Sequence, residues 1–283
     1  TMRIHQWIKN FLVFVPMLAA HQITYENFSN SLLAFIVFCL IASSIYIVND
    51  LLDLNVDRSH PYNKFRPFAS GQVTIQNGMI ISTILFFIGT LVSFLIGVKF
   101  TLLILLYWML TIVYSIKLKR KAIIDIFILG TLYTIRISGG SFATEIQISF
   151  WLFVFSIFLF LSLAAVKRQS ELVDLINNKQ FQTKGRDYNA DDLPIISMIA
   201  LSSGISSVLV SILYINSPEV LFLYSKIWTL GIASFVLFFW LMRIIFMSNR
   251  GMIHGDPIIY ALKDSTSIFC FLSVVLLFVI NFI

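Results

Sequence analysis

The sequence predicts an all-α integral membrane protein with about nine transmembrane helices. Of its 283 residues, 58% are hydrophobic and only 12% are charged, and the mean hydropathy is +0.89. A soluble domain usually carries about 25% charged residues, so this chain has too few to cover a surface exposed to water. Apolar runs recur along nearly the whole sequence, and we therefore expect one transmembrane domain over residues 1–283.

The number of helices follows from the lengths of the apolar runs. A bilayer core needs about 20 predominantly apolar residues for each helix that crosses it. The runs that meet or approach this length predict spans at about 8–22, 30–52, 74–97, 100–116, 122–142, 148–170, 194–214, 219–247 and 258–282. The first run is short, which fits a helix that is tilted or lies partly at the membrane interface.

The basic residues indicate the orientation of these spans. With a cytoplasmic N-terminus, all but three of the 20 lysines and arginines fall in cytoplasmic segments; the exceptions are Lys99, Lys226 and Arg136. Basic residues are retained on the cytoplasmic side, so we expect a multi-pass protein of the inner (plasma) membrane with its active site on that side. The net charge of +6 would then meet anionic lipids or phosphorylated substrates, and we expect no nucleic acid partner.

A run of aspartates ends the second predicted helix. Asn49 and Asp50 are followed by Asp53 and Asp57, and spacings of three and four residues place the three carboxylates on one helical face. Such charges repel unless cations neutralise them, and hard oxygen ligands suit Mg²⁺, which takes one or two carboxylates plus substrate phosphates. We predict that Asp50, Asp53 and Asp57 are metal ligands and catalytic residues. The alternative is a solvated acidic helix end that pairs with nearby basic residues.

A basic loop follows the aspartates directly and contains Arg58, His60, Lys64 and Arg66. Arginine binds phosphate through its bidentate fork, and lysine binds it as a point charge. These residues therefore predict phosphate binding beside the metal. His60 fits either a phosphate contact or a capping hydrogen bond.

Two patterns in this region resemble a known family. The pattern N-D-x-x-D-x-x-x-D over residues 49–57, followed by K-x-R-P over 64–67, is similar to the first motif of the UbiA-type intramembrane prenyltransferase superfamily. This resemblance implies a UbiA-like fold of nine helices around a central cavity, and an enzyme that uses Mg²⁺. It also implies that Asn49 belongs to the substrate site.

Further motifs resemble one branch of that superfamily, the decaprenyl-phosphate phosphoribosyltransferases. They are R-x-H-P at residues 58–61, Q-W-x-K-N-x-L-V-F at 6–14 and Y-S-x-x-L-K at 114–119. The branch moves a phosphoribosyl group from phosphoribosyl diphosphate (PRPP) to a polyprenyl phosphate. The resemblance thus implies these two substrates, and it adds Lys9, Tyr114 and Lys119 to the expected substrate-binding residues.

A second polar constellation begins at the end of the sixth predicted helix. In ordinary prenyltransferases of the superfamily an aspartate pair, D-x-x-x-D, stands near this point, whereas here the spacing is occupied by Lys167 and Glu171. A cation in place of an anion favours an additional phosphate, and K-R-x-x-E-L resembles the second motif of the phosphoribosyltransferase branch. We expect substrate binding by Lys167, Arg168, Glu171, Arg186 and Tyr188. The alternative is an i, i+4 ion pair worth a few tenths of a kcal/mol.

Arg136 stands alone within an apolar run. An arginine inside a membrane helix costs about 2.5 to 3.5 kcal/mol on insertion scales, unless it is paired or faces water. We expect Arg136 to face the cavity and bind substrate. The alternatives are that it snorkels to the interface or pairs with Glu145.

These features, together with what the resemblance to the phosphoribosyltransferase branch implies, predict Mg²⁺-dependent transfer of a 5-phosphoribosyl group from PRPP to a polyprenyl phosphate, with release of diphosphate. The alternative enzyme is a prenyltransferase that moves a prenyl chain from its diphosphate to an aromatic or other small acceptor. A transporter is the rival from another class, because intramembrane charges also mark ion pathways. The charges lie at one face and no pair of broken helices occupies matching halves, which favours an enzyme.

Overall fold

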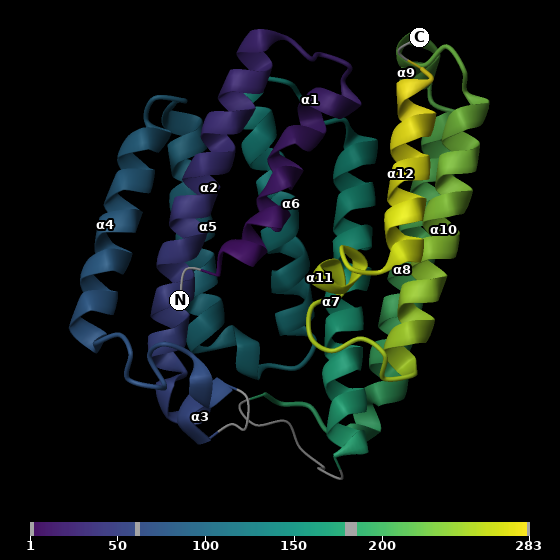
Figure 1. The fold of residues 1–283 in the computed structure, drawn as a ribbon. Helices are drawn as coiled ribbons and strands as arrows, with labels where there is room; N and C mark the ends of the chain where they lie inside the picture. The colour runs from purple at the N-terminus through teal and green to yellow at the C-terminus, as the bar shows by residue number, and fades with distance from the viewer. Residues whose placement is uncertain (1–2, 60–62, 179–185, 282–283) are drawn as a thin grey trace. The chain divides into compact units, whose positions relative to one another are not determined.

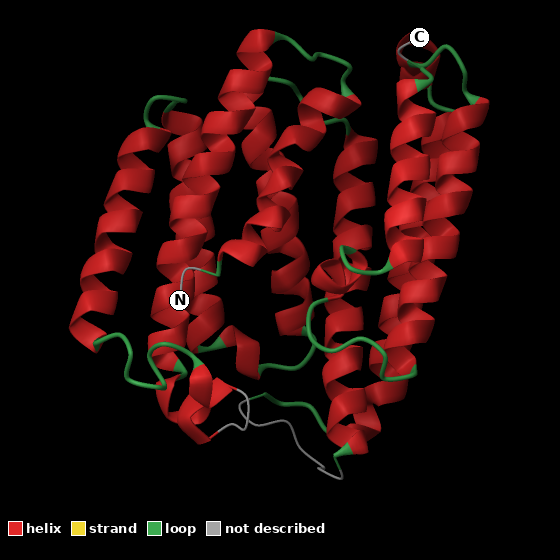
Figure 2. Cartoon of the chain, in the orientation of Figure 1, coloured by secondary structure: helices red, strands yellow, loops and turns green. Residues whose placement is uncertain are grey.

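The computed structural model describes residues 3–59, 63–178 and 186–281, and the regular elements in these ranges are all helices (Figures 1 and 2). The chain forms two compact units. The first unit comprises Thr1–Lys119 and Ile135–Ile148, and the second comprises Arg120–Thr134 and Ser149–Ile283. The chain passes from one unit to the other within helix α6.

Within the described residues, seven helices are long and apolar enough to cross a membrane. They are α2 (Tyr25–Leu52), α4 (Ile75–Ser93), α5 (Val98–Ile116), α6 (Ile124–Thr144), α7 (Phe150–Asn177), α8 (Leu193–Ile215) and α10 (Trp228–Asn249). A shorter apolar helix, α12 (Ser265–Val279), follows them, and the chain begins with the 3-10 helix η1 (Ile4–Phe14) and α1 (Val15–Ala19). The predicted all-helical membrane fold is confirmed, and the described elements agree approximately with nine spans.

The structure differs from the prediction where polar side chains stop or restart a helix. The eighth predicted span is divided into α9 (Pro218–Leu223) and α10, and the ninth into α11 (Pro257–Ala261) and α12. Helix α12 restarts because the Asp264 side chain accepts a hydrogen bond from the Ser267 amide at 2.8 Å, which satisfies one orphan donor of its first turn. In contrast, α7 continues beyond its predicted end at residue 170, because its last turns carry the buried residues Leu172, Val173 and Leu175.

In the first unit, α2 packs against η1, α4 and α5. Its middle is buried, and Ser44 lies within hydrogen-bonding distance of Ser82 on α4, at 3.1 Å between the hydroxyl oxygens. The second half of α6 approaches η1 so closely that a Cβ atom at Gly140 would lie 1.9 Å from the Val13 carbonyl oxygen. Only a residue without a side chain fits there.

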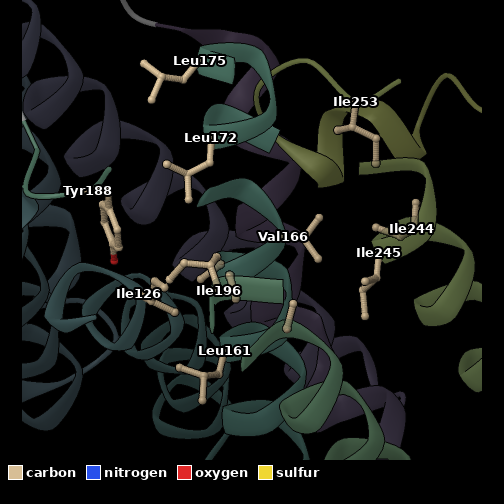
Figure 3. Close-up of a cluster of buried hydrophobic side chains, with 13 residues drawn as sticks. Ile126, Leu161, Val166, Leu172, Leu175, Tyr188, Ile196, Ile244, Ile245 and Ile253 are labelled. Carbon is tan, nitrogen blue, oxygen red and sulfur yellow. The ribbon is translucent and has the colours of Figure 1, made fainter. Parts of the chain in front are cut away.

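In the second unit, α7 and α8 form the main contact, and α10 packs on both of them. Small residues allow this close approach: the Ser162 hydroxyl donates to the Ala200 carbonyl oxygen at 2.7 Å, and Gly204 faces the same serine. Small side chains of this kind are typical of helix contacts in membranes. Figure 3 shows a cluster of buried apolar side chains in this unit, whose members include Val166, Leu172, Ile196 and Ile244.

Gly140→Ala should destabilise the protein, because the new methyl group would collide with backbone that cannot rotate away. Overpacking typically costs about 1 to 3 kcal/mol, which in a large chain lowers Tm by roughly 2 to 12 °C. Thermal unfolding of the purified protein in detergent measures this. The matched control is Gly231→Ala on α10, where nothing lies within 4 Å of the new atom. Equal Tm values for the two variants would contradict the close contact.

Candidate active site

The three predicted metal ligands lie where α2 gives way to α3 (Leu54–Ser59). Asp50 is on the last turn of α2, Asp53 is its C-cap residue, and Asp57 is on α3. The expected single helical face is therefore interrupted at Asp53, although the Asp57 amide still donates to the Asp53 carbonyl oxygen at 2.8 Å. Asp50 and Asp57 are buried, whereas the Asp53 side chain is 29% exposed.

Each of these carboxylates has a basic partner. Arg66 Nη1 lies 2.7 Å from Asp57 Oδ2 and 3.7 Å from Asp50 Oδ1. Arg3 Nη2 lies 2.5 Å from the same Asp50 oxygen, and Lys119 Nζ lies 2.6 Å from Asp53 Oδ1. The pairing of the aspartates with basic residues is thus present, and it offsets the repulsion among them.

Asp50 and Asp57 suit a divalent cation as ligands. Both present a carboxylate oxygen to the same Arg66 nitrogen, so two hard donors converge on a position that favours positive charge. Mg²⁺ commonly takes one or two carboxylates and completes its shell with phosphate and water. In the described ranges no three His, Cys, Asp or Glu side chains form a metal-binding group. The three-carboxylate set that includes Asp53 therefore stays a prediction.

A pocket of about 730 Å³ lies beside Asp50 in the first unit. Its lining includes Arg3, His5, Gln6 and Arg66. Two arginines next to a buried carboxylate can hold an anion whose other oxygens bind a cation. Arg3 was missed by the sequence analysis, because its partner Asp50 is 47 positions away and no local spacing connects them.

The other predicted residues of the first unit lie on several elements. Arg58 is exposed on α3, and Lys64 lies with its Nζ 5.1 Å from the Phe65 ring. Asn49 and Tyr114 are partly exposed, near the C-terminal ends of α2 and α5. His60 falls outside the described residues.

Arg136 is buried in the half of α6 that belongs to the first unit. Its Nε donates to Asn10 Oδ1 at 2.8 Å, and its Nη2 donates to the Tyr107 hydroxyl at 2.7 Å. The guanidinium group also lies 5.0 Å from the centre of the Tyr107 ring, a cation–π distance. Lys9, the neighbour of Asn10 on η1, is likewise buried, so two basic side chains lie inside this unit.

The second unit contains a second polar cluster, formed by Asp125, Arg168, Glu171, Arg186 and Tyr188. Asp125 Oδ2 lies 2.6 Å from Arg168 Nε and 3.6 Å from Arg186 Nη1. The Tyr188 hydroxyl donates to Asp125 Oδ1 at 2.5 Å, and Glu171 pairs with both arginines. Burial, and then the hydrogen bond to Asp125 and the charge of that carboxylate, raise the pKa of Tyr188 above its ordinary value.

Four of the five predicted residues of this constellation are thus brought together. The fifth, Lys167, lies with its Nζ 3.8 Å from Asp256 Oδ2, just before α11. Asp125 is the residue that the sequence analysis missed. A carboxylate at the start of an apolar helix was an available signal, because such charges are costly and need a partner.

The fold and the two polar clusters describe a multi-pass membrane enzyme of the transferase class. The chain belongs to the UbiA prenyltransferase family, whose model matches residues 11–252. The family membership agrees with the resemblance that the aspartate motif predicts.

Three relatives illustrate the breadth of the family. The chain is 36% identical over 270 residues to protein y4nM of Sinorhizobium fredii, covering 95% of this chain and 52% of that one. It is 32% identical over 274 residues to nodulation protein NoeC of Azorhizobium caulinodans, covering 97% and 89%. It is 35% identical over 175 residues to decaprenyl-phosphate phosphoribosyltransferase of Mycolicibacterium smegmatis, covering 60% and 55%. The matched region is about half the length of the first and third relatives.

Solved structures share the fold at low sequence identity. A UbiA homolog from Archaeoglobus fulgidus, bound to GPP and Mg²⁺, has a TM-score of 0.71 at 14% identity, covering 99% of this chain and 96% of that one. A digeranylgeranylglyceryl phosphate synthase has a TM-score of 0.66 at 18% identity, covering 98% and 93%.

Asp50→Asn should weaken the binding of a divalent cation, because it removes one charged donor from the pair that converges on Arg66. A charge-assisted contact is worth about 1.5 to 3 kcal/mol, so we expect roughly tenfold to hundredfold lower affinity for Mn²⁺ in the presence of inorganic diphosphate. Electron paramagnetic resonance of free Mn²⁺ measures this affinity. The control is Asp191→Asn, an exposed carboxylate that should leave the affinity unchanged. Unchanged affinity in Asp50→Asn would remove this residue from the metal site.

Proposed function

We propose that this protein is a Mg²⁺-dependent transferase that moves a 5-phosphoribosyl group from PRPP to a polyprenyl phosphate and releases diphosphate. The observation that carries this proposal is the composition of the second polar cluster. Arg168 and Arg186 both contact Glu171 in this cluster, near the position where ordinary members of the superfamily have an aspartate pair. Two guanidinium groups suit a phosphate, which PRPP carries in addition to its diphosphate.

The first unit supplies the groups that a leaving diphosphate needs. Asp50 and Asp57 would hold the cation, while Arg3 and Arg66 would bind diphosphate oxygens from the adjoining pocket. Mg²⁺ supplies charge neutralisation on the diphosphate as the bond between C1 of the ribose and oxygen breaks. The relatives named decaprenyl-phosphate phosphoribosyltransferase support the same reaction.

The acceptor needs little activation in this reaction. A phosphate monoester has its second pKa near 6, so the polyprenyl phosphate is already anionic at neutral pH. Its oxygen forms the new bond to C1 while the diphosphate takes the electrons of the old one, and no general base has to remove a proton. Lys64, Lys119 and Lys167 are candidates for holding the remaining phosphate oxygens.

Prenyl transfer from a prenyl diphosphate is the second candidate. The aspartates would serve it equally well, and a digeranylgeranylglyceryl phosphate synthase of Sulfurisphaera tokodaii is 31% identical over 93 residues. The arginines of the second polar cluster favour phosphoribosyl transfer over prenyl transfer to an acceptor without a phosphate, because a prenyl diphosphate itself has no additional phosphate for them to bind.

We also propose that the N-terminus and the basic loops face the cytoplasm of a plasma membrane. Lys99 and Lys117 flank α5 at its two ends and are both exposed, which makes them a matched pair for labelling. Cys39 and Cys270 are buried, so background labelling should be low. An impermeant thiol reagent applied outside intact cells should label Lys99→Cys and not Lys117→Cys. The opposite pattern would reverse the orientation.

Lys167 separates the two reactions. With PRPP, polyprenyl phosphate and Mg²⁺, Lys167→Ala should lose roughly tenfold to hundredfold in kcat/KM, since a charge-assisted hydrogen bond is worth about 1.5 to 3 kcal/mol. Lys167→Asp should be worse, because it adds repulsion. Mass analysis of the lipid product measures the activity of both Lys167 variants. The control is Lys263→Ala, at an exposed position.

Under the prenyl-transfer alternative, an aspartate at position 167 would restore a metal ligand and should be tolerated. Wild-type protein that ignores PRPP but consumes a prenyl diphosphate, together with an active Lys167→Asp variant, would therefore decide for prenyl transfer. Activity of the wild-type protein in excess chelator would remove the Mg²⁺ dependence from either reaction.

A further inference from the structure

The side chains of the second polar cluster range from fully buried to partly exposed. The side chains of Asp125 and Arg168 are 0% and 1% exposed, whereas those of Arg186 and Glu171 are 24% and 29% exposed. Asp125 lies 2.6 Å from Arg168 and 3.6 Å from Arg186, and Glu171 also contacts both arginines. One buried and one accessible carboxylate therefore hold the same two guanidinium groups.

Asp125 and Glu171 differ in whether a phosphate ligand can replace them. A buried guanidinium needs a buried counter-charge, because removing one partner of such a pair leaves an uncompensated charge. Asp125 meets this need for Arg168. Glu171 is accessible to solvent, and a phosphate offers the same two arginines more oxygens and a higher negative charge. A phosphate can therefore replace Glu171 while Asp125 stays in place.

Tyr188 connects this pair to the backbone. Its hydroxyl donates to Asp125 Oδ1 and accepts from the Ile123 amide at 2.7 Å. A tyrosine hydroxyl is protonated at neutral pH, so it donates to the carboxylate, and burial and the hydrogen bond to Asp125 raise its pKa further. Tyr188 also follows Arg186 by two residues, so anchoring its ring restricts the segment that carries this arginine.

We infer that Asp125 is a positioning residue, which with Tyr188 holds Arg168 and Arg186 in place for a phosphate monoester that displaces Glu171. The inference rests on the proposed function in making this monoester part of a substrate. The same chemistry occurs in the 5-phosphate of PRPP and in the headgroup of a polyprenyl phosphate.

The test uses the full-length purified protein in detergent with excess chelator, so that no metal site contributes. Ribose 5-phosphate and farnesyl phosphate are titrated separately by calorimetry. We expect the wild-type protein to bind one of them, and this identifies the source of the monoester. Asp125→Asn and Tyr188→Phe should weaken that ligand tenfold or more, whereas Glu171→Gln should bind it as well as the wild type or better, because a competing anion is removed.

The gain or retention of affinity in Glu171→Gln is a readout that a merely structural cluster would not give. Asp264→Asn is the control, because it breaks another arginine–carboxylate pair of the second unit, with Arg243 at 2.6 Å. It should lower Tm and leave the affinity unchanged. If Asp125→Asn does not fold, Tyr188→Phe, which removes a single hydroxyl group, decides.

The inference is overturned if the wild-type protein binds neither ligand. It is also overturned if folded Asp125→Asn or Tyr188→Phe binds with wild-type affinity, or if Glu171→Gln loses affinity. Its failure is distinguishable from failure of the proposed function. A protein that binds ribose 5-phosphate through Asp125, yet forms no phosphoribosyl lipid, keeps the positioning role and removes the proposed reaction.

Discussion

One constraint governs both the aspartates around Asp50 and the second polar cluster: a charge that is buried away from water must be neutralised by an opposite charge. An ion that leaves water loses several kcal/mol of solvation even after the protein relaxes around it, and a membrane protein cannot easily recover this at its surface. Asp50 in the first unit and Asp125 in the second are both nearly inaccessible, and each lies within 2.6 Å of an arginine. The positions of the functional groups are therefore set by the need for counter-ions.

The same pairing makes the clusters suitable for phosphorylated substrates. A carboxylate bound to arginine can exchange its partner for a metal ion, and the released arginine can then bind a phosphate oxygen. Charge stays balanced through the exchange when metal and phosphate arrive together. Arg66, which contacts both Asp50 and Asp57, is placed for such an exchange. A paired resting arrangement is thus compatible with a ligand-binding role for the aspartates.

The sequence predicts the long helices well because apolar length alone determines a membrane span. It predicts their interruptions less well, although Asp264 before Ser265-Thr266-Ser267 is an N-cap signal that could have divided the last span. The partners of buried charges were harder to predict. Asp125 and Tyr188 are 63 positions apart, and no helical spacing relates residues that different elements bring together. Arg168 and Arg186 were predicted as ligands, but their shared contact with Asp125 could be found only from the structure.

Substrate choice can change in this family without changing the fold. The apolar middle of each helix dominates the free energy of membrane insertion, and a charge costs most at the centre of the bilayer. Lys167 lies in the last three turns of α7, and Asp53 lies just beyond α2, so replacements at these positions leave the apolar middle of their helices intact. This accounts for a shared architecture at 14% identity to a homolog that binds GPP and Mg²⁺. Under the proposed function, the chemistry depends on a few polar residues near helix ends, and one of them, Arg168, is paired with a carboxylate that is inaccessible to solvent.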